Sequence, residues 1–346
     1  MISVRVNDNS ELSREILHRQ KFSFYYPDGT SSNGSDPLPC LADGFYIMVA
    51  EGMLRTGTYP GDSVIYDIER ELRVFRDVFR KLIFPDDDRY YDEIKRLPLW
   101  ITMGGMSSDF CASKASFEKM YRLLDAPSSY NAHMYIADVS YLINSIGNLI
   151  IGMEANFVDY FRLLSQTSPS GCTADGTYVV RGQHAELVIS ILGSYYSRLY
   201  SILDLFTKAA YEFENPRMRF EKYPRLNCSG ILYNNKQRLR INNRRGTIFD
   251  KDDQIIAIES IRNEIIHNGM WEDIARVYVT IKEHVPVERY VLFPDMEKGR
   301  FVAYGNRHHF FSEGIKVNSI LPQLHISFLS RLAKSIREVY SQNVEC

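Results

Sequence analysis

Three side chains near residue 265 are of the types that bind phosphate and move protons: Arg262, Asn263 and His267. Asn263 and His267 are four residues apart, so on a helix they share one face, and the long Arg262 side chain reaches the same place. Arginine offers a fixed fork of donors that matches phosphate oxygens, and histidine gains or loses a proton near neutral pH. The three residues therefore predict a phosphate site with an acid–base group.

A helix that ends just after these residues must position them. Its buried face is predicted by four isoleucines at helical spacing, Ile255, Ile258, Ile261 and Ile265. We expect the helix to begin near Asp250, because Asp252 and Asp253 suit its positive N-terminal end. Gly269 supplies a natural stop.

A basic segment comes directly before this helix. Residues 215–251 hold ten lysines and arginines against two acids, a formal charge of +8 in a chain whose net charge is -2. Such an island is a candidate contact for a polyanion, although a solvated loop is the plain alternative. The candidate RNA-binding residues are Arg217, Arg219, Arg238, Arg240, Arg244 and Arg245. Four interleaved aromatic residues could stack on unpaired bases or simply pack the loop: Phe220, Tyr223, Tyr233 and Phe249.

Length and composition indicate a folded protein with room for two domains. The chain has 346 residues, of which 45% are hydrophobic. No uninterrupted apolar run reaches the roughly 20 residues of a membrane span, and the first residues lack a signal pattern. The five cysteines are scattered, which favours reduced thiols over disulfides or a zinc site. We expect a cytoplasmic protein with no membrane association.

The C-terminal part, residues 128–346, has the pattern of long helices. Helices are expected from Ser128 or Ser129 to about Gln166, from about Gln183 to Phe213, over 250–269, and from about 318 to 342. Strands are expected at 276–281, 289–293 and 300–304, the last two as a hairpin, and at 231–233 and 239–241 in the basic segment. The sequence thus predicts a four-helix bundle with a small β insertion.

Residues 1–127 are expected to form a separate small α+β module, so the fold class is mainly α and α+β as a whole. We expect strands at 41–50 and 97–103, helices at 64–84 and 113–124, and an acidic loop at 85–93. The pair Gly104–Gly105 is interpreted as a turn, although it could cradle an anion. A sensing or regulatory role for the module is inferred from its position alone.

The helix order and the motif together resemble the HEPN superfamily. These are helical domains, associated with nucleotides and RNA, that carry Arg, a polar residue, a few further residues and then His. Here the pattern is Arg262-Asn263-Glu264-Ile265-Ile266-His267, and Asn directly after Arg is the form typical of active members. The motif is loose by itself; its place in the third of four helices, beside a basic segment, adds weight. The resemblance covers about residues 128–346.

The resemblance implies a metal-independent endoribonuclease, without cofactor, in which two copies of the motif meet in a homodimer. RNA supplies its own nucleophile, the 2′-hydroxyl, so the protein needs only a proton carrier and a cation for the developing charge. His267 would be the general acid or base and Arg262 the phosphate clamp. Asn263 would orient His267 or bind a phosphate oxygen, with Glu264 and Asn268 in support. The family's frequent roles imply a toxin or antiviral-defence effector, with an antitoxin or regulatory protein as partner.

Two alternatives stay open. Arg262 and His267 could be structural, with Arg262 paired to Glu259 or Glu264 and His267 capping the last carbonyls of the helix. The domain could also be a catalytically silent HEPN module that binds RNA, a nucleotide or a protein partner.

The remaining histidines carry weaker signals. His308 and His309 are adjacent and have no cysteine or acidic cluster beside them, so we expect no metal site there, although they could contact RNA. His184 and His325 are interpreted as packing or surface residues within helices.

Overall fold

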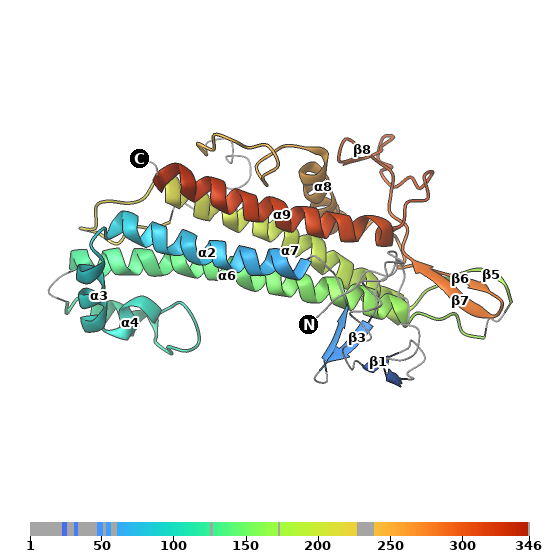
Figure 1. The fold of residues 1–346 in the computed structure, drawn as a ribbon, viewed down its shortest axis with the longest axis horizontal. Coiled ribbons are helices and arrows are strands. Elements are labelled where there is room, and N and C mark those ends of the chain that lie inside the picture. Colours follow the sequence, from blue (N-terminus) through green and yellow to red (C-terminus); the bar gives the residue numbers. More distant parts are fainter. Residues whose placement is uncertain are drawn as a thin grey trace. The chain divides into compact units, whose positions relative to one another are not determined.

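The computed structural model describes residues 61–124, 127–171, 174–226 and 239–344, together with the backbone of four short strands nearer the N-terminus (Figure 1). These strands are β1 (Ser23–Tyr25), β2 (Ser31–Asn33), β3 (Ile47–Ala50) and β4 (Met53–Thr56). They form an antiparallel sheet in the order β2-β1-β3-β4. The strand expected at 41–50 is confirmed for residues 47–50, and its first half lies outside the described residues.

Helices dominate the described chain, which confirms the mainly α class. They are α2 (Gly61–Ile83), α3 (Asp87–Arg96), α4 (Leu99–Met103), α5 (Lys114–Tyr121), α6 (Pro127–Ser165), α7 (Gln183–Glu214), α8 (Asp253–Asn268) and α9 (Val317–Val344). The helices expected from apolar periodicity correspond to α2, α5, α6, α7, α8 and α9. Periodicity succeeded there because each of these segments is long or carries a clear cap, such as Ser113, whose side chain accepts from the Ser116 N–H.

The contacts divide the chain into two compact units, and the three longest helices contribute to both. Unit 1 comprises Met1–Ile65, Ile151–Tyr200 and Lys251–Ser330; unit 2 comprises Tyr66–Ile150, Ser201–Asp250 and Arg331–Cys346. The expected division into a module 1–127 and a HEPN-like domain 128–346 stays a prediction.

Unit 1 has an aromatic core with one buried histidine. The ring of Phe157 on α6 lies 6.2 Å from Tyr195 on α7 and 4.5 Å from His325 on α9, centroid to centroid. All three side chains are fully buried. The second half of α6, the first half of α7 and the first part of α9 are thereby joined in one apolar layer.

Unit 2 is built around α2. Phe75 and Phe79 repeat at helical spacing and are buried. The Phe75 ring centroid lies 4.5 Å from that of Phe213 on α7, and the Phe79 centroid lies 5.6 Å from that of Tyr135 on α6. Helix α2, which the sequence assigns to the N-terminal module, therefore packs against the long helices in this unit.

Besides the sheet of β1 to β4, two further short antiparallel sheets belong to unit 1. One has the order β5-β6-β7, from β5 (Gly176–Val180), β6 (Val277–Lys282) and β7 (Val285–Tyr290). The other pairs β8 (Met296–Glu297) with β9 (Arg300–Phe301). The strand expected at 276–281 is confirmed as β6.

The expected hairpin is confirmed only in part: β9 pairs with β8 across Lys298 and Gly299, whereas the run expected at 289–293 is not its partner. A second hairpin, which was not expected, joins β6 to β7 across Glu283 and His284, whose φ angles are 51° and 65°. Those positive φ angles are usually signalled by Asn or Gly, which are missing here, so the turn was not recognised. The run expected at 289–293 is strand only to Tyr290, and the run expected at 300–304 is strand only to Phe301. Strand β5 was not expected at all.

Two further predictions in the first half of the chain were wrong. The acidic loop expected at 85–93 is mostly helix α3, which buries none of its residues and so shows no apolar periodicity. It is capped instead by Asp86, whose side chain accepts from the Arg89 N–H. The strand expected at 97–103 is helix α4 over Leu99–Met103, and Pro98 precedes it at the N-cap position with an extended backbone. Gly104 and Gly105 form the turn after α4, as expected.

The short strands expected in the basic segment have no counterpart among the described residues. Leu239 and Ile241 are buried singly, outside any strand, and residues 231–233 lie outside the described ranges. Apolar residues at alternate positions have the sequence pattern of a strand, but a strand forms only when its backbone pairs with a neighbouring strand.

In the part of the chain that is described, one helix, Ser128–Ser165, is long and apolar enough to cross a membrane by length and composition; core helices of soluble proteins pass the same test. The expectation of no membrane association stays a prediction.

Candidate functional site

Helix α8 begins and ends where its sequence signals predict. The Asp252 side chain accepts a hydrogen bond from the Ile255 N–H at 3.2 Å, which caps the N-terminus. Gly269 follows the last turn with a φ angle of 92°, a conformation that glycine adopts without strain. Three of the four predicted isoleucines are buried, Ile255, Ile258 and Ile261, whereas Ile265 is only partly buried. Because these isoleucines face the interior, Asn263 and His267 lie on the exposed side of α8.

Arg262 is held in place by two neighbours. Its Nη1 donates a hydrogen bond to Oδ1 of Asn263 at 3.0 Å. Its guanidinium carbon lies 4.6 Å from the ring centroid of Tyr200 on α7, a cation–π contact. These are the contacts of Arg262 with other described residues, so the ion pair with Glu264, one of the two partners considered in the structural alternative, is not formed. No sequence pattern links Tyr200 to Arg262, because the two residues lie on different helices, α7 and α8.

His267 lies in the last turn of α8 and is exposed, as are Asn263 and Asn268. Within the described ranges His267 makes no hydrogen bond or ion pair, so it does not cap the last carbonyls of the helix there. An exposed imidazole one turn after Asn263, on the same face, is accessible to a ligand. The structure thus brings Arg262 and Asn263 into contact and leaves His267 open beside them.

The supporting role of Glu264 stays a prediction, and the structure gives the contacts of its side chain. It is buried, and its Oε1 lies 3.0 Å from Nε2 of His309, so a hydrogen bond ties the loop around His309 to α8. The His309 ring also makes an edge contact with Phe301, 5.8 Å between centroids. Glu264 therefore connects the buried face of α8 to the loop around His309. The RNA contact suggested for His308 and His309 stays a prediction.

Glu259 lies one turn before Arg262 and was not singled out as a site residue. It is partly buried, and loss of hydration raises its pKa to about 8, with the nearby Arg300 acting in the opposite direction. At neutral pH the protonated, uncharged form therefore predominates. A neutral Glu259 leaves the positive charge of Arg262 largely uncompensated on this stretch of α8.

The candidate RNA-binding arginines belong to unit 2, whereas the motif belongs to unit 1. Arg219, Arg240 and Arg245 are exposed, and the Arg240 backbone N–H donates to Glu214 at 2.8 Å. These three guanidiniums are accessible to an anion. Their binding of RNA stays a prediction.

The other three candidates differ. Arg244 donates from Nη2 to the Leu239 carbonyl at 2.6 Å, so its side chain braces the segment. Arg217 is partly buried, and its Nε is enclosed without a hydrogen-bond partner among the described residues. Arg238 lies outside the described residues.

The aromatic residues of the basic segment are used mainly for packing. Phe249 is buried against Phe206, with 5.9 Å between the ring centroids. The Tyr223 hydroxyl donates to the Asp138 carboxylate. Phe220 lies 6.0 Å from Tyr135, centroid to centroid. Tyr233 lies outside the described ranges. Local packing, one of the two open interpretations, therefore accounts for Phe249.

His325 is buried in a polar network of unit 1. Its Nε2 lies 2.8 Å from Oε2 of Glu154, and its Nδ1 lies 3.1 Å from the Tyr195 hydroxyl. His184 places Nε2 2.8 Å from the Leu163 carbonyl oxygen. Both histidines pack within the fold, as expected. No group of three or more His, Cys, Asp or Glu among the described residues is placed to hold a metal ion.

No protein-family model matches this chain, and neither the curated proteins nor the solved structures contain a match.

Proposed function

We propose that this protein is a metal-independent endoribonuclease of the HEPN type. One observation supports this most: Arg262 and Asn263 are in contact at the end of α8, and His267 is exposed on the next turn with no competing partner among the described residues. A fixed cation, an amide and an accessible imidazole are the groups that cleavage of RNA at phosphorus requires.

The reaction uses the RNA's own 2′-hydroxyl. That oxygen loses its proton and attacks the adjacent phosphorus, and the bond to the 5′-oxygen breaks as that oxygen gains a proton. The products carry a 2′,3′-cyclic phosphate and a 5′-hydroxyl. His267 takes or gives one of the two protons, Arg262 holds the charge on the phosphorane oxygens, and Asn263 orients His267 or binds a phosphate oxygen.

A single His267 cannot sit on both sides of the phosphorus at once. We propose that two chains form a homodimer in which the two motifs make one site. A cytoplasmic toxin or antiviral-defence role, held in check by an antitoxin or another regulatory protein, is proposed by family analogy.

The rival proposal is a catalytically silent HEPN module that binds RNA, a nucleotide or a protein. One observation favours it: the guanidinium of Arg262 is already engaged by Tyr200 and Asn263. For catalysis the free donors on Arg262 must still reach a phosphate, whereas a binding module has no such requirement.

The decisive experiment incubates the purified protein with total RNA in excess EDTA, beside the His267→Ala protein. We expect cleavage that survives chelation and falls at least about 100-fold in the variant, because removal of a positioned acid or base costs on the order of 10²–10⁴ in rate. The ends should be 2′,3′-cyclic phosphates, which a phosphatase alone does not remove.

A matched control is His284→Ala, because His284 is also exposed but lies in the β6–β7 turn. It should keep full activity. Full activity in His267→Ala would exclude the proposed site, and RNA left intact by the wild type would favour the binding module.

A further inference from the structure

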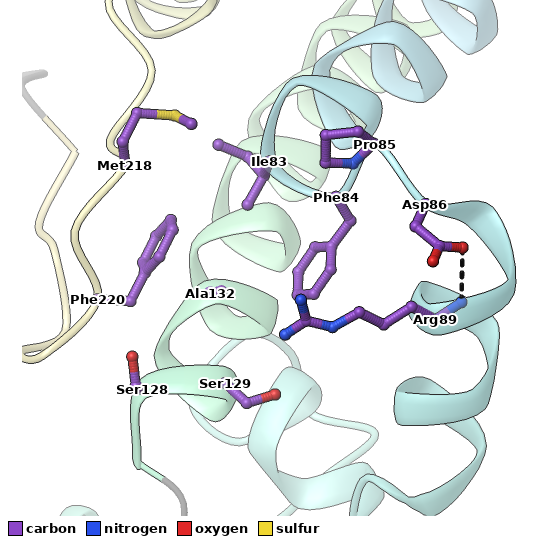
Figure 2. A pocket seen from close by; sticks show the side chains of 10 residues that line it. All are labelled: Ile83, Phe84, Pro85, Asp86, Arg89, Ser128, Ser129, Ala132, Met218 and Phe220. Atoms are coloured by element: carbon purple, nitrogen blue, oxygen red, sulfur yellow. Dashed lines mark hydrogen bonds between the residues drawn. The ribbon is translucent and has the colours of Figure 1, made fainter.

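Unit 2 contains a pocket of about 640 Å³, and none of the residues that line it belongs to the α8 motif (Figure 2). It lies between the segment that joins α2 to α3, the first turn of α6 and the chain near Phe220. The apolar residues of its wall are Ile83, Phe84, Pro85, Ala132, Met218 and Phe220, and its polar residues are Asp86, Arg89, Ser128 and Ser129. Its volume is in the range of sites for small organic ligands, roughly 300–1,000 Å³.

The aromatic walls are held rigidly. Phe84 is buried and stacks on His133, with 4.7 Å between the ring centroids and 28° between the planes. The Phe220 carbonyl accepts a hydrogen bond from Nδ2 of Asn131 at 2.9 Å. Asn131 is itself buried and accepts from the Tyr121 hydroxyl. A flat ligand would therefore meet preformed apolar surfaces from two different segments.

Arg89 is the polar group aimed into the pocket. Its Nε donates to Oε1 of Glu93 at 2.8 Å, which fixes one edge of the guanidinium. Its central carbon lies 5.9 Å from the Phe84 ring centroid. Figure 2 shows the side chain reaching from α3 across Phe84, with its terminal nitrogens on the side of Ser128 and Ser129. Those two nitrogens have no hydrogen-bond partner in the described parts of the chain, so they form a free fork of donors.

The charges of the lining select the class of ligand. The Arg89 guanidinium is paired with Glu93, and Asp86 adds a negative charge at the rim of the pocket, where its carboxylate accepts a hydrogen bond from the Arg89 backbone N–H at 3.1 Å. A lining with one positive and one negative group does not favour a polyanion such as a nucleoside triphosphate. It favours a neutral, flat ligand that presents two adjacent acceptors to the arginine fork.

We propose that this pocket binds a guanine base. The O6 and N7 atoms of guanine are two adjacent acceptors whose spacing matches the end of an arginine side chain. The ring has apolar faces for Phe84 and Phe220, and the sugar would lie near the exposed Ser128. Adenine fits less well, because its 6-amino group would face the arginine donors. This proposal does not depend on the motif of α8, since it concerns binding in a different unit.

The test is equilibrium dialysis of the full-length protein with guanosine, adenosine and uridine. We expect guanosine to bind at least about tenfold more tightly than adenosine, the lower range of discrimination for a bidentate arginine contact. Arg89→Ala should abolish that preference, and Arg89→Lys should not restore it, because lysine keeps the charge but lacks the fork. Arg96→Ala is the matched control, since Arg96 is exposed on the same helix and does not line the pocket. Ser128→Trp should block the pocket from its exposed side.

The base can come from a free nucleoside or from an RNA strand. A 2′-O-methylated oligouridine with one central guanosine, which cannot be cleaved through a 2′-hydroxyl, distinguishes these sources. Tighter binding of this strand than of guanosine would assign the pocket to RNA, and equal binding to the free nucleoside. Equal affinity for guanosine and adenosine, unchanged guanosine binding in Arg89→Ala, or no guanosine bound at about 1 mM would each overturn the proposal. Loss of nuclease activity in His267→Ala leaves this result untouched.

Discussion

At the residue scale, burial has changed the ionisation of one group beside the motif, Glu259. Arg262 lies over the Tyr200 ring, and Glu259, one turn away, carries a proton at neutral pH because burial opposes its ionisation. Glu264, directly in the motif, is bound by His309. Arg262 therefore carries a positive charge that is not paired with a carboxylate among the described residues, which suits the approach of an anion.

Glu259→Gln should make the protein more stable at alkaline pH. The pKa of Glu259 rises from its ordinary value of 4.5 to about 8 in the folded state, so the folded state binds the proton more tightly than the unfolded state does. Stability should therefore fall as pH rises between these two values, and glutamine removes that loss. We expect a gain on the order of 1 kcal/mol at pH 8, discounted for partial exposure, and little change below pH 4.5.

Urea denaturation of both proteins across this pH range measures the difference. Glu283→Gln, at an exposed position in the β6–β7 turn, should show no such pH-dependent gain. A constant difference between Glu259→Gln and the wild type at every pH would mean that Glu259 ionises normally in the folded protein.

At the element scale, α8 is held by the β8–β9 hairpin. The Ser260 hydroxyl donates to the Gly299 carbonyl at 2.9 Å. Gly299 has a φ of 73°, and a Cβ placed there would lie 2.3 Å from the Asp253 carbonyl oxygen on α8. The turn therefore approaches the first turn of α8 as closely as the backbone allows.

Gly299→Ala should destabilise the protein by about 2 kcal/mol or more, because it combines an unfavourable φ with a clash against backbone. Thermal denaturation followed by circular dichroism measures the loss. Gly305→Ala is the matched control: Gly305 has a φ of 58° but nothing within 4 Å of the added Cβ, so only the conformational cost of about 1 kcal/mol applies. Equal losses in the two variants would show that α8 tolerates a displaced hairpin.

At the scale of the whole molecule, the chain has two compact units and a single copy of the motif. A site that requires two copies must then come from two chains. The proposed activity consequently depends on assembly as well as on His267.

The specific activity of the proposed ribonuclease should rise with protein concentration and level off as the dimer saturates, because a monomer carries only half of the site. A mixture of His267→Ala and Arg262→Ala chains should regain only part of the wild-type rate, since each mixed dimer lacks one residue on each side. Analytical ultracentrifugation over the same concentrations measures the assembly. Activity per chain that stays constant while the protein is monomeric would exclude the composite site.

The sequence by itself determined the elements whose information is local. The isoleucine spacing, Asp252 and Gly269 were sufficient to place α8. They give the buried face, the N-terminal cap and the end of the helix, and all of them lie within or next to the helix itself. The long helices α6, α7 and α9 were predicted for the same reason. The acidic helix α3 was missed because it has no buried face and depends on its Asp86 cap.

Only the tertiary structure decided which distant residues meet. No local pattern links Tyr200 to Arg262, His309 to Glu264, or Phe220 to Phe84, because each pair joins segments far apart in the chain. The same holds for the β6–β7 hairpin, whose turn residues lack the usual signal, and for the raised pKa of Glu259, which depends on burial. Contacts and hydration are properties of the packed chain, so residue types alone predicted the chemistry of the motif but not its surroundings.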